Sequence, residues 1–204
     1  MSERLRWARA LQAVAQSGLT YTDSPYDRER YETVRSIAAE IAASVGDEEL
    51  PHLLARFCAE YGYATPKVDV RGVVIDGGKV LLVREVGAAD WTLPGGWADV
   101  GATPREAVEK EVLEEAGVRS SAIRVLAVYD RDFRQRPVWP AHVYKLYVLC
   151  EPTGGPPAGD GVETEAAAYF PLDDLPPLSF KTPADHLHGV LEIARDPSRG
   201  AALD

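Results

Sequence analysis

Three carboxylates, Glu111, Glu114 and Glu115, stand close together shortly after a pair of glycines. On a helix at 100° per residue they fall within about 100° of one another, beside an apolar stripe. Like charges at this spacing destabilise a helix by roughly 0.2–0.5 kcal/mol per pair, so something should neutralise them. Oxygen ligands of this kind suit Mg²⁺, or alternatively Mn²⁺, which would join the carboxylates to the phosphate oxygens of a substrate. For an isolated Glu-x-x-Glu-Glu, a solvated acidic face is the alternative.

The elements that must position these carboxylates lie on both sides of them. Thr103 can cap a helix over residues 104–116, and Glu106 can reach back to the backbone of Thr103. Proline occupies the first helical position, and Gly117 follows directly as a natural helix end. The preceding residues 93–101 form a glycine loop that leads into this helix.

The rest of the chain separates into two parts. The first third repeats at the helical period and predicts three helices, at about 3–17 with its end at Gly18, from Tyr31 to Val45, and at about 50–61. From Val68 the pattern predicts strands at 73–75 and 80–83 joined by a hairpin, and further strands at 91–94, 123–129, 142–150 and 166–170. A last helix is expected at 183–195. This irregular order favours an α+β class, with a helical N-terminal module over residues 1–65 and a second domain over 66–204.

Composition and charge exclude several functions. The chain has 204 residues, 46% of them hydrophobic, which is typical of a globular protein. Its 22 Lys+Arg against 32 Asp+Glu give a net charge of −10, which argues against sequence-independent binding of nucleic acid. No apolar run approaches the roughly 18–20 residues of a membrane span, so we expect a cytoplasmic protein. Cys58 and Cys150 are expected to be buried and reduced, without a disulfide.

The segment Gly96–Val118 resembles the Nudix box, G-x5-E-x7-R-E-U-x-E-E-x-G-U, where U is aliphatic. The resemblance implies an α/β/α sandwich with a mixed sheet and hydrolysis of a nucleoside diphosphate linked to another group X. Glu111, Glu114 and Glu115 would then be the metal-binding and catalytic carboxylates. Gly96 would offer its backbone carbonyl to the metal.

Two positions depart from that pattern, because Ala102 replaces the first Glu of the box and Lys110 replaces the Arg. In the family these two side chains help to orient the catalytic helix. The departures resemble a subgroup with a helical N-terminal module, which includes CDP-choline and ADP-ribose pyrophosphatases. That likeness rests on Gly96–Gly101, Lys110, the helical segment from Trp7 to Tyr31, Val128–Asp132 and Val143–Leu146. It implies a homodimer formed through the module and a small nucleotide substrate such as ADP-ribose or CDP-choline.

Other candidates lie outside the box. Glu163 follows a loop rich in Gly and Pro, and related enzymes often place a general base or an extra metal ligand in this loop; the alternative is a solvated loop residue. Trp97 can stack on a nucleobase or cover the core, and Asp99 is its neighbour in the glycine loop. Further substrate contacts are expected from polar residues at the mouths of neighbouring strands, with surface or structural roles as the alternative: Arg131, His142 and Lys145.

Two other functions are compatible with the same motif. One is pyrophosphohydrolysis of nucleoside triphosphates or RNA ends, although the lack of a basic face argues against long RNA. The other is a non-catalytic nucleotide sensor. Sensors of this kind usually lose carboxylates from the helix, whereas all three are present here, which favours an enzyme.

Overall fold

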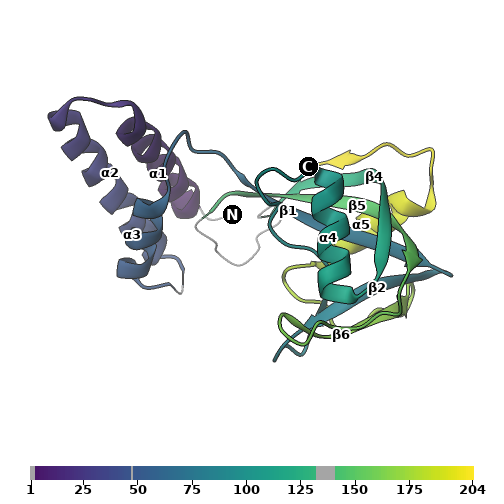
Figure 1. Cartoon of the computed structure of the whole chain (residues 1–204). Helices are drawn as coiled ribbons and strands as arrows, with labels where there is room; N and C mark the ends of the chain where they lie inside the picture. Colours follow the sequence, from purple (N-terminus) through teal and green to yellow (C-terminus); the bar gives the residue numbers. More distant parts are fainter. Residues whose placement is uncertain (1–2, 47, 132–140) are drawn as a thin grey trace. The chain divides into compact units, whose positions relative to one another are not determined.

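The computed structural model describes residues 3–46, 48–131 and 141–204 and divides into two compact units (Figure 1). The first unit comprises Met1–Lys67 with Arg131–Val143, and the second comprises Val68–Asp130 with Tyr144–Asp204. Within the described ranges, no helix combines the length and the apolar character needed to cross a bilayer.

The first unit contains the helices α1 (Glu3–Tyr21), α2 (Pro25–Ala43) and α3 (Leu50–Ala59). Helix α2 begins after Ser24, whose hydroxyl accepts the amide N–H of Asp27 at 3.3 Å. The buried contacts among the three helices use mainly small side chains, which allow the backbones to approach closely: Ala8, Ala38, Ala39, Ala42, Leu53 and Phe57.

Gly18 does not end the first helix, and that prediction is wrong. Helix α1 continues to Tyr21. A Cβ atom at Gly18 would lie 2.4 Å from ring atoms of Tyr31 on α2, so glycine leaves room here for an aromatic ring. Sequence periodicity cannot separate a glycine that ends a helix from one that admits a neighbouring side chain.

The second unit is built on a mixed seven-stranded sheet, as far as the described residues show. The strand order is β3-β2-β1-β5-β4-β7, and β6 pairs with β2. The β1–β2, β2–β3, β2–β6 and β4–β5 pairs are antiparallel, and β4–β7 is parallel. The strands are β1 (Lys67–Asp76), β2 (Lys79–Glu85), β3 (Trp91–Thr92), β4 (Arg119–Asp130), β5 (Val143–Gly154), β6 (Thr164–Pro171) and β7 (Ala202–Leu203). The predicted hairpin is confirmed, since Asp76 pairs with Lys79, whereas β7 was not predicted.

Two helices cover the sheet, α4 (Pro104–Ala116) and α5 (Ala184–Arg195) (Figure 1). Alternate residues of one strand enter different cores, because side chains along a strand point to opposite faces. Leu81 of β2 packs in the core that contains α4, whereas Leu82 packs in the core that contains α5. The two helices therefore lie on opposite faces, which confirms the predicted α+β class and the α/β/α sandwich.

Helix α4 lies directly on β1 at Gly72. A Cβ atom at this glycine would lie 2.4 Å from Cγ2 of Val112 on the helix. Because this is much closer than two carbon atoms can approach, any larger residue would push the helix away from the strand. Gly72 therefore sets the spacing between α4 and the sheet.

The two cysteines are free, as predicted, but only one of them is buried. Cys150 lies in the core under α4, and its burial raises the pKa of the thiol to about 12. Cys58 is exposed, so its predicted burial is wrong. It follows Phe57, which faces the core of the first unit, and a step of 100° along α3 turns Cys58 away from that core.

Candidate active site

The helix that carries the three candidate carboxylates begins and ends as predicted. The hydroxyl of Thr103 accepts the amide N–H of Glu106 at 3.2 Å, and Oε2 of Glu106 accepts the amide N–H of Thr103 at 2.8 Å. This reciprocal pair is a capping box. At the other end, Gly117 adopts φ of 69° and donates its amide N–H to the carbonyl of Leu113 at 3.0 Å. Local sequence therefore fixes α4 at both ends.

The glycine loop is held along β1 by backbone hydrogen bonds. They run from the amides of Val70, Gly72 and Ala98 to the carbonyls of Gly96, Pro94 and Val68, at 2.8, 2.9 and 3.0 Å. A Cβ atom at Gly95, where φ is 142°, would lie 2.0 Å from the Val70 carbonyl oxygen, so only glycine fits there. The Gly96 carbonyl has a second lone pair beside the one that Val70 occupies, and its role toward a metal stays a prediction.

Glu115 faces this loop and is buried, with 9% of its surface exposed. Its Oε2 accepts the amide N–H of Gly95 at 2.8 Å. Burial raises the pKa of Glu115 to about 7, although the Gly95 bond and the nearby Arg71 guanidinium act in the opposite direction. The folded chain therefore holds a carboxylate that is costly to ionise, next to the loop.

Glu111 lies one turn earlier on α4 and faces Gly96. A Cβ atom at Gly96 would lie 3.0 Å from Oε2 of Glu111. Burial raises the pKa of Glu111, and the negative charges of Glu114 and Glu163 raise it further, against the opposing effect of Lys110. Of these charges, that of the loop residue Glu163 has the smallest effect on Glu111.

Glu114 is more exposed than the other two, and Lys110 lies beside it. The ammonium of Lys110 is 3.6 Å from Oε2 of Glu114 and 2.8 Å from Oδ2 of Asp99. The lysine at the position of the family's arginine therefore joins the glycine loop to the helix. Asp99, predicted as a substrate contact, has this partner in the structure.

The donor chemistry of the site fits a hard divalent cation. Carboxylate oxygens that repel one another in a half-buried setting are stabilised by such an ion. In the part of the chain that the structure describes, however, no three His, Cys, Asp or Glu side chains converge on one point. Glu115 is bonded to the Gly95 amide and Glu114 lies beside Lys110. Binding a metal therefore requires side chains of α4 to turn.

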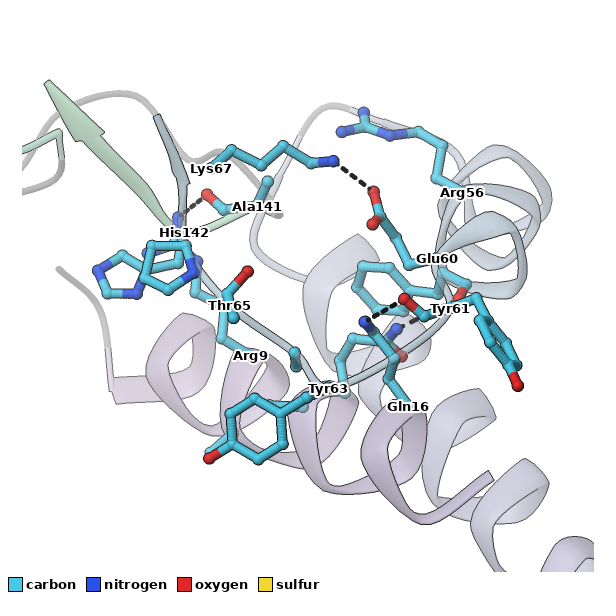
Figure 2. A pocket seen from close by; sticks show the side chains of 16 residues that line it. Arg9, Gln16, Arg56, Glu60, Tyr61, Tyr63, Thr65, Lys67, Ala141 and His142 are labelled. Atoms are coloured by element: carbon cyan, nitrogen blue, oxygen red, sulfur yellow. Dashed lines mark hydrogen bonds and ion pairs between the residues drawn. The ribbon is translucent and has the colours of Figure 1, made fainter. Parts of the chain in front are cut away.

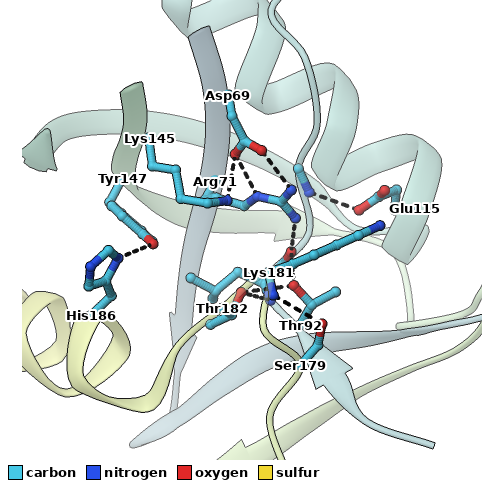
Figure 3. A network of polar contacts seen from close by, with 12 residues as sticks. Asp69, Arg71, Thr92, Glu115, Lys145, Tyr147, Ser179, Lys181, Thr182 and His186 are labelled. Carbon is cyan, nitrogen blue, oxygen red and sulfur yellow. Dashed lines mark hydrogen bonds and ion pairs between the residues drawn. The ribbon is translucent and has the colours of Figure 1, made fainter. Parts of the chain in front are cut away.

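A buried polar network lies behind the glycine loop (Figure 3). Arg71 donates from Nε and Nη2 to the carboxylate of Asp69, at 2.7 and 2.9 Å, and from Nη1 to the Leu93 carbonyl at 3.0 Å. The ammonium of Lys145 is 3.2 Å from Oδ1 of Asp69. Burial opposes ionisation of Asp69, but Arg71 and Lys145 outweigh it and hold the pKa of this carboxyl below its usual value. The network holds the start of the loop, at Leu93, to β1.

Comparison with known proteins agrees with the geometry. Residues 65–189 match the family model described as NUDIX domain. The chain belongs to the Nudix family. Residues 2–57 match a second model, described as UDP-X-like, N-terminal oligomerisation domain. The predictions of a Nudix pyrophosphohydrolase and of a helical N-terminal module are confirmed.

One relative in sequence and two solved structures are also similar to this chain. The putative ADP-ribose pyrophosphatase YjhB of Bacillus subtilis (strain 168) is 40% identical over 202 residues, which cover 98% of this chain and 96% of the relative. A crystal structure of a UDP-X diphosphatase matches with a TM-score of 0.64 and 31% identity, covering 99% of this chain and 98% of that one. A crystal structure of an ADP-ribose pyrophosphatase from Streptococcus suis matches with a TM-score of 0.61 and 40% identity, over 69% of this chain and all of that one.

The remaining predicted substrate residues of this Nudix hydrolase are divided between the two units. Trp97 is 48% exposed in the glycine loop, so its indole is not buried in the core. Lys145 lies near the start of β5, as predicted, but its side chain is 2% exposed and lies against Asp69, so a contact with the substrate stays a prediction. Arg131 and His142 belong to the first unit.

His142 lines a cavity of about 390 Å³ in that unit (Figure 2). Its carbonyl accepts the amide N–H of Lys67 at 2.9 Å, and residues of α1 and α3 line the cavity with it. The second unit contains the carboxylates. A contact of Arg131 or His142 with the substrate stays a prediction.

Sequence reasoning missed several charged residues around the candidate site. Arg71 could have been noticed, because Asp69 and Arg71 are charges inside an otherwise apolar strand. The charge of Glu85, at the end of β2, raises the pKa of Glu115, and the ammonium of Lys181 lies 2.5 Å from Oε1 of Glu85. These last two come from distant segments, and no local pattern marks them.

Proposed function

We propose that this Nudix hydrolase cleaves the pyrophosphate bond of a nucleoside diphosphate linked to a group X. The products are a nucleoside monophosphate and phosphorylated X. The observation that carries the proposal is the pair of burial-perturbed carboxylates, Glu111 and Glu115, that α4 holds against the glycine loop. The names of the relatives support ADP-ribose and UDP-linked compounds as first candidates, and CDP-choline completes the group predicted from the sequence.

The proposed cofactor is Mg²⁺, with Mn²⁺ as the alternative. Glu111, Glu115 and the carbonyl of Gly96 would hold it, and Glu114 would add a ligand after leaving Lys110. When bound, such a cation neutralises charge on the phosphates and favours attack by water. Glu115 would bind the ion as a carboxylate, so binding is coupled to release of its proton, and its second oxygen can serve as the ligand while Oε2 keeps the Gly95 bond.

Glu163 is the proposed general base. It is exposed, unlike Glu115, and it acts on the pKa of Glu111 through its charge. An exposed carboxylate can accept a proton from the attacking water and release it to solvent. Glu114 is the second candidate for this step. Trp97, half exposed in the glycine loop, offers a flat apolar face on which a nucleobase can stack.

We further propose that the helical module over residues 1–65 joins two copies of the chain in a homodimer. The match to a model described as an oligomerisation domain supports this assignment. Light scattering of the full chain should give twice the mass of 22.2 kDa, and a monomer at micromolar concentration would contradict the dimer. A cytoplasmic location stays a prediction.

The activity is tested with a substrate panel and Mg²⁺. The panel contains ADP-ribose, UDP-sugars, CDP-choline, nucleoside triphosphates and RNA with a 5′-triphosphate, and the readout is released monophosphate or pyrophosphate. We expect monophosphate from at least one nucleoside diphosphate derivative, and we expect EDTA to stop the reaction.

Glu111→Gln and Glu115→Gln should each lower kcat by about 10²-fold or more, the loss expected when a group that stabilises transition-state charge is removed. Glu32→Gln, on the exposed face of α2, serves as the matched control. Turnover that survives both substitutions would refute the assignment of these residues. Tight binding of a nucleotide without any released product would instead favour a sensor.

A further inference from the structure

Thr164 connects the end of α4 to the loop that carries Glu163. The Thr164 side chain is completely buried. Its hydroxyl donates to the backbone carbonyl of Glu115 at 2.6 Å and accepts the amide N–H of Asp160 at 3.2 Å. One hydroxyl therefore joins the backbone of a proposed metal ligand to the turn that holds the proposed base.

Asp160 organises that turn from the other side. Its Oδ1 accepts the amide N–H groups of Val162, Glu163 and Thr164 at 3.0, 2.9 and 2.8 Å. The amide of Gly161 donates to the Thr164 carbonyl at 2.8 Å, which closes the turn. These bonds, the one from Thr164 first, hold the pKa of Asp160 below its usual value. The carboxylate that fixes the turn therefore stays ionised at neutral pH.

The same loop also occupies the next carbonyl of α4. The amide of Ala158 donates to the carbonyl of Ala116 at 2.9 Å. The last carbonyls of a helix have no partner within the helix and usually face water. Here the loop uses two of them in succession, so its position is coupled to the last turn of α4.

Glu163 is held in this arrangement by its backbone at both sides. Its amide N–H is donated to Asp160, and its carbonyl accepts the amide N–H of Val86 at 3.0 Å, just after β2. Its exposed side chain starts from a fixed Cα atom. Such fixing matters because a displacement of about 1 Å in a reacting group can cost roughly 10²-fold in rate.

From these contacts we infer that Thr164 and Asp160 are positioning residues, which set the place of the Glu163 carboxylate relative to Glu111 and Glu115. This inference rests on the proposed function of those three glutamates. Neither Thr164 nor Asp160 takes part in the chemical step itself, and both act through the backbone of the turn.

The test compares Thr164→Val, which removes the hydroxyl at constant shape, with Thr164→Ser, which keeps it. With the substrate and Mg²⁺ of the activity assay, Thr164→Val should lower kcat about tenfold or more and change KM less than about threefold. Thr164→Ser should restore most of the rate. The control is Thr20→Val, since the Thr20 hydroxyl also donates to a helical carbonyl and accepts an amide N–H, but in the first unit.

Positioning through Glu163 is separated from a general loss of structure by a double substitution. In a Glu163→Gln background, Thr164→Val should cost less than about twofold in kcat, because the residue it positions is already disabled. A double variant whose loss in kcat equals the product of the two single losses would overturn the inference. A Thr164→Ser variant as slow as Thr164→Val would overturn it as well. Asp160→Ala, at an exposed position, repeats the test in case the buried substitution impairs folding.

Hydrogen exchange separates failure of this inference from failure of the proposed function. The amides of Val162, Glu163 and Thr164 should exchange at least tenfold faster in Asp160→Ala and in Thr164→Val, while those in the middle of α4 keep their protection. Unchanged exchange would overturn the positioning role even in an active enzyme. If these amides exchange faster in the variants but the wild-type chain hydrolyses no substrate, the role of Thr164 and Asp160 in holding the turn stands and the proposed function is refuted.

Discussion

Glu115→Gln should stabilise the metal-free protein at neutral and alkaline pH while it lowers kcat by about 10²-fold or more. Burial raises the pKa of Glu115 from its ordinary value of 4.5 to about 7, so the folded chain binds this proton more tightly than the unfolded chain does. The contribution of Glu115 to the free energy of unfolding is therefore greatest below pH 4.5, falls as the pH rises to about 7, and is constant above. Between low and high pH, this contribution of Glu115 to the free energy of unfolding changes by about 3 kcal/mol.

Glutamine imitates the protonated acid and can still accept the Gly95 amide N–H through its amide oxygen. Urea unfolding in EDTA should therefore give the two proteins similar stability near pH 4.5. At pH 8 the variant should be more stable by up to about 3 kcal/mol. Glu114→Gln, on the exposed side of α4, is the matched control and should change the stability by a few tenths of a kcal/mol, as expected for an exposed ion pair.

Saturating Mg²⁺ should reduce or reverse the advantage of the variant, because the ion binds only the ionised wild-type carboxylate. The apparent metal affinity of the wild type should accordingly increase with pH up to about 7. A Glu115→Gln protein that is less stable than the wild type at pH 8 without metal would refute the reasoning. So would a difference in stability that does not change between pH 4.5 and pH 8.

Three further outcomes follow from the packing and the ion pairs. Gly18→Ala should destabilise the first unit by about 1–3 kcal/mol in thermal unfolding, despite the better helix propensity of alanine, because the added methyl group meets the ring of Tyr31. A second substitution, Tyr31→Leu, should relieve part of this cost. If Gly18→Ala stabilises the unit instead, the Tyr31 ring does not fill the space beside Gly18. Lys110→Met should barely change the melting temperature but should raise the Mg²⁺ concentration needed for half-maximal activity severalfold, because the bond to Asp99 joins the loop to the helix; an unchanged Mg²⁺ requirement would argue against that link. Arg71→Met should cost about 3–5 kcal/mol in urea unfolding, since it leaves a buried carboxylate without its main partner, and a loss below about 1 kcal/mol would contradict this.

Helix α4 and the glycine loop were predictable because their determinants are local. The Thr103–Glu106 capping box and the Gly117 terminus depend on neighbours within a few residues, and the structure shows both as expected. The glycine loop was likewise identified from its own residues. The sequence therefore predicted both ends of α4, whereas the roles of its carboxylates stay a proposal.

The surroundings of the carboxylates depend on distant segments, and there the prediction failed or fell short. Lys145 is part of a strand whose pattern does not reveal that its ammonium meets Asp69 inside the protein. Glu85 and Lys181 reach the site only because the sheet and the segment before α5 bring them together. Gly18 shows the same limit for packing, since its role depends on a ring from the next helix.

Strand β1 supports both the glycine loop and helix α4. The glycine loop is bonded to its backbone from Val68 to Gly72, and α4 rests on it at Gly72. The loop and the helix therefore share one support, the backbone of β1 from Val68 to Gly72. A substitution that displaces β1 is therefore expected to move the loop and the helix together rather than to widen the space between them.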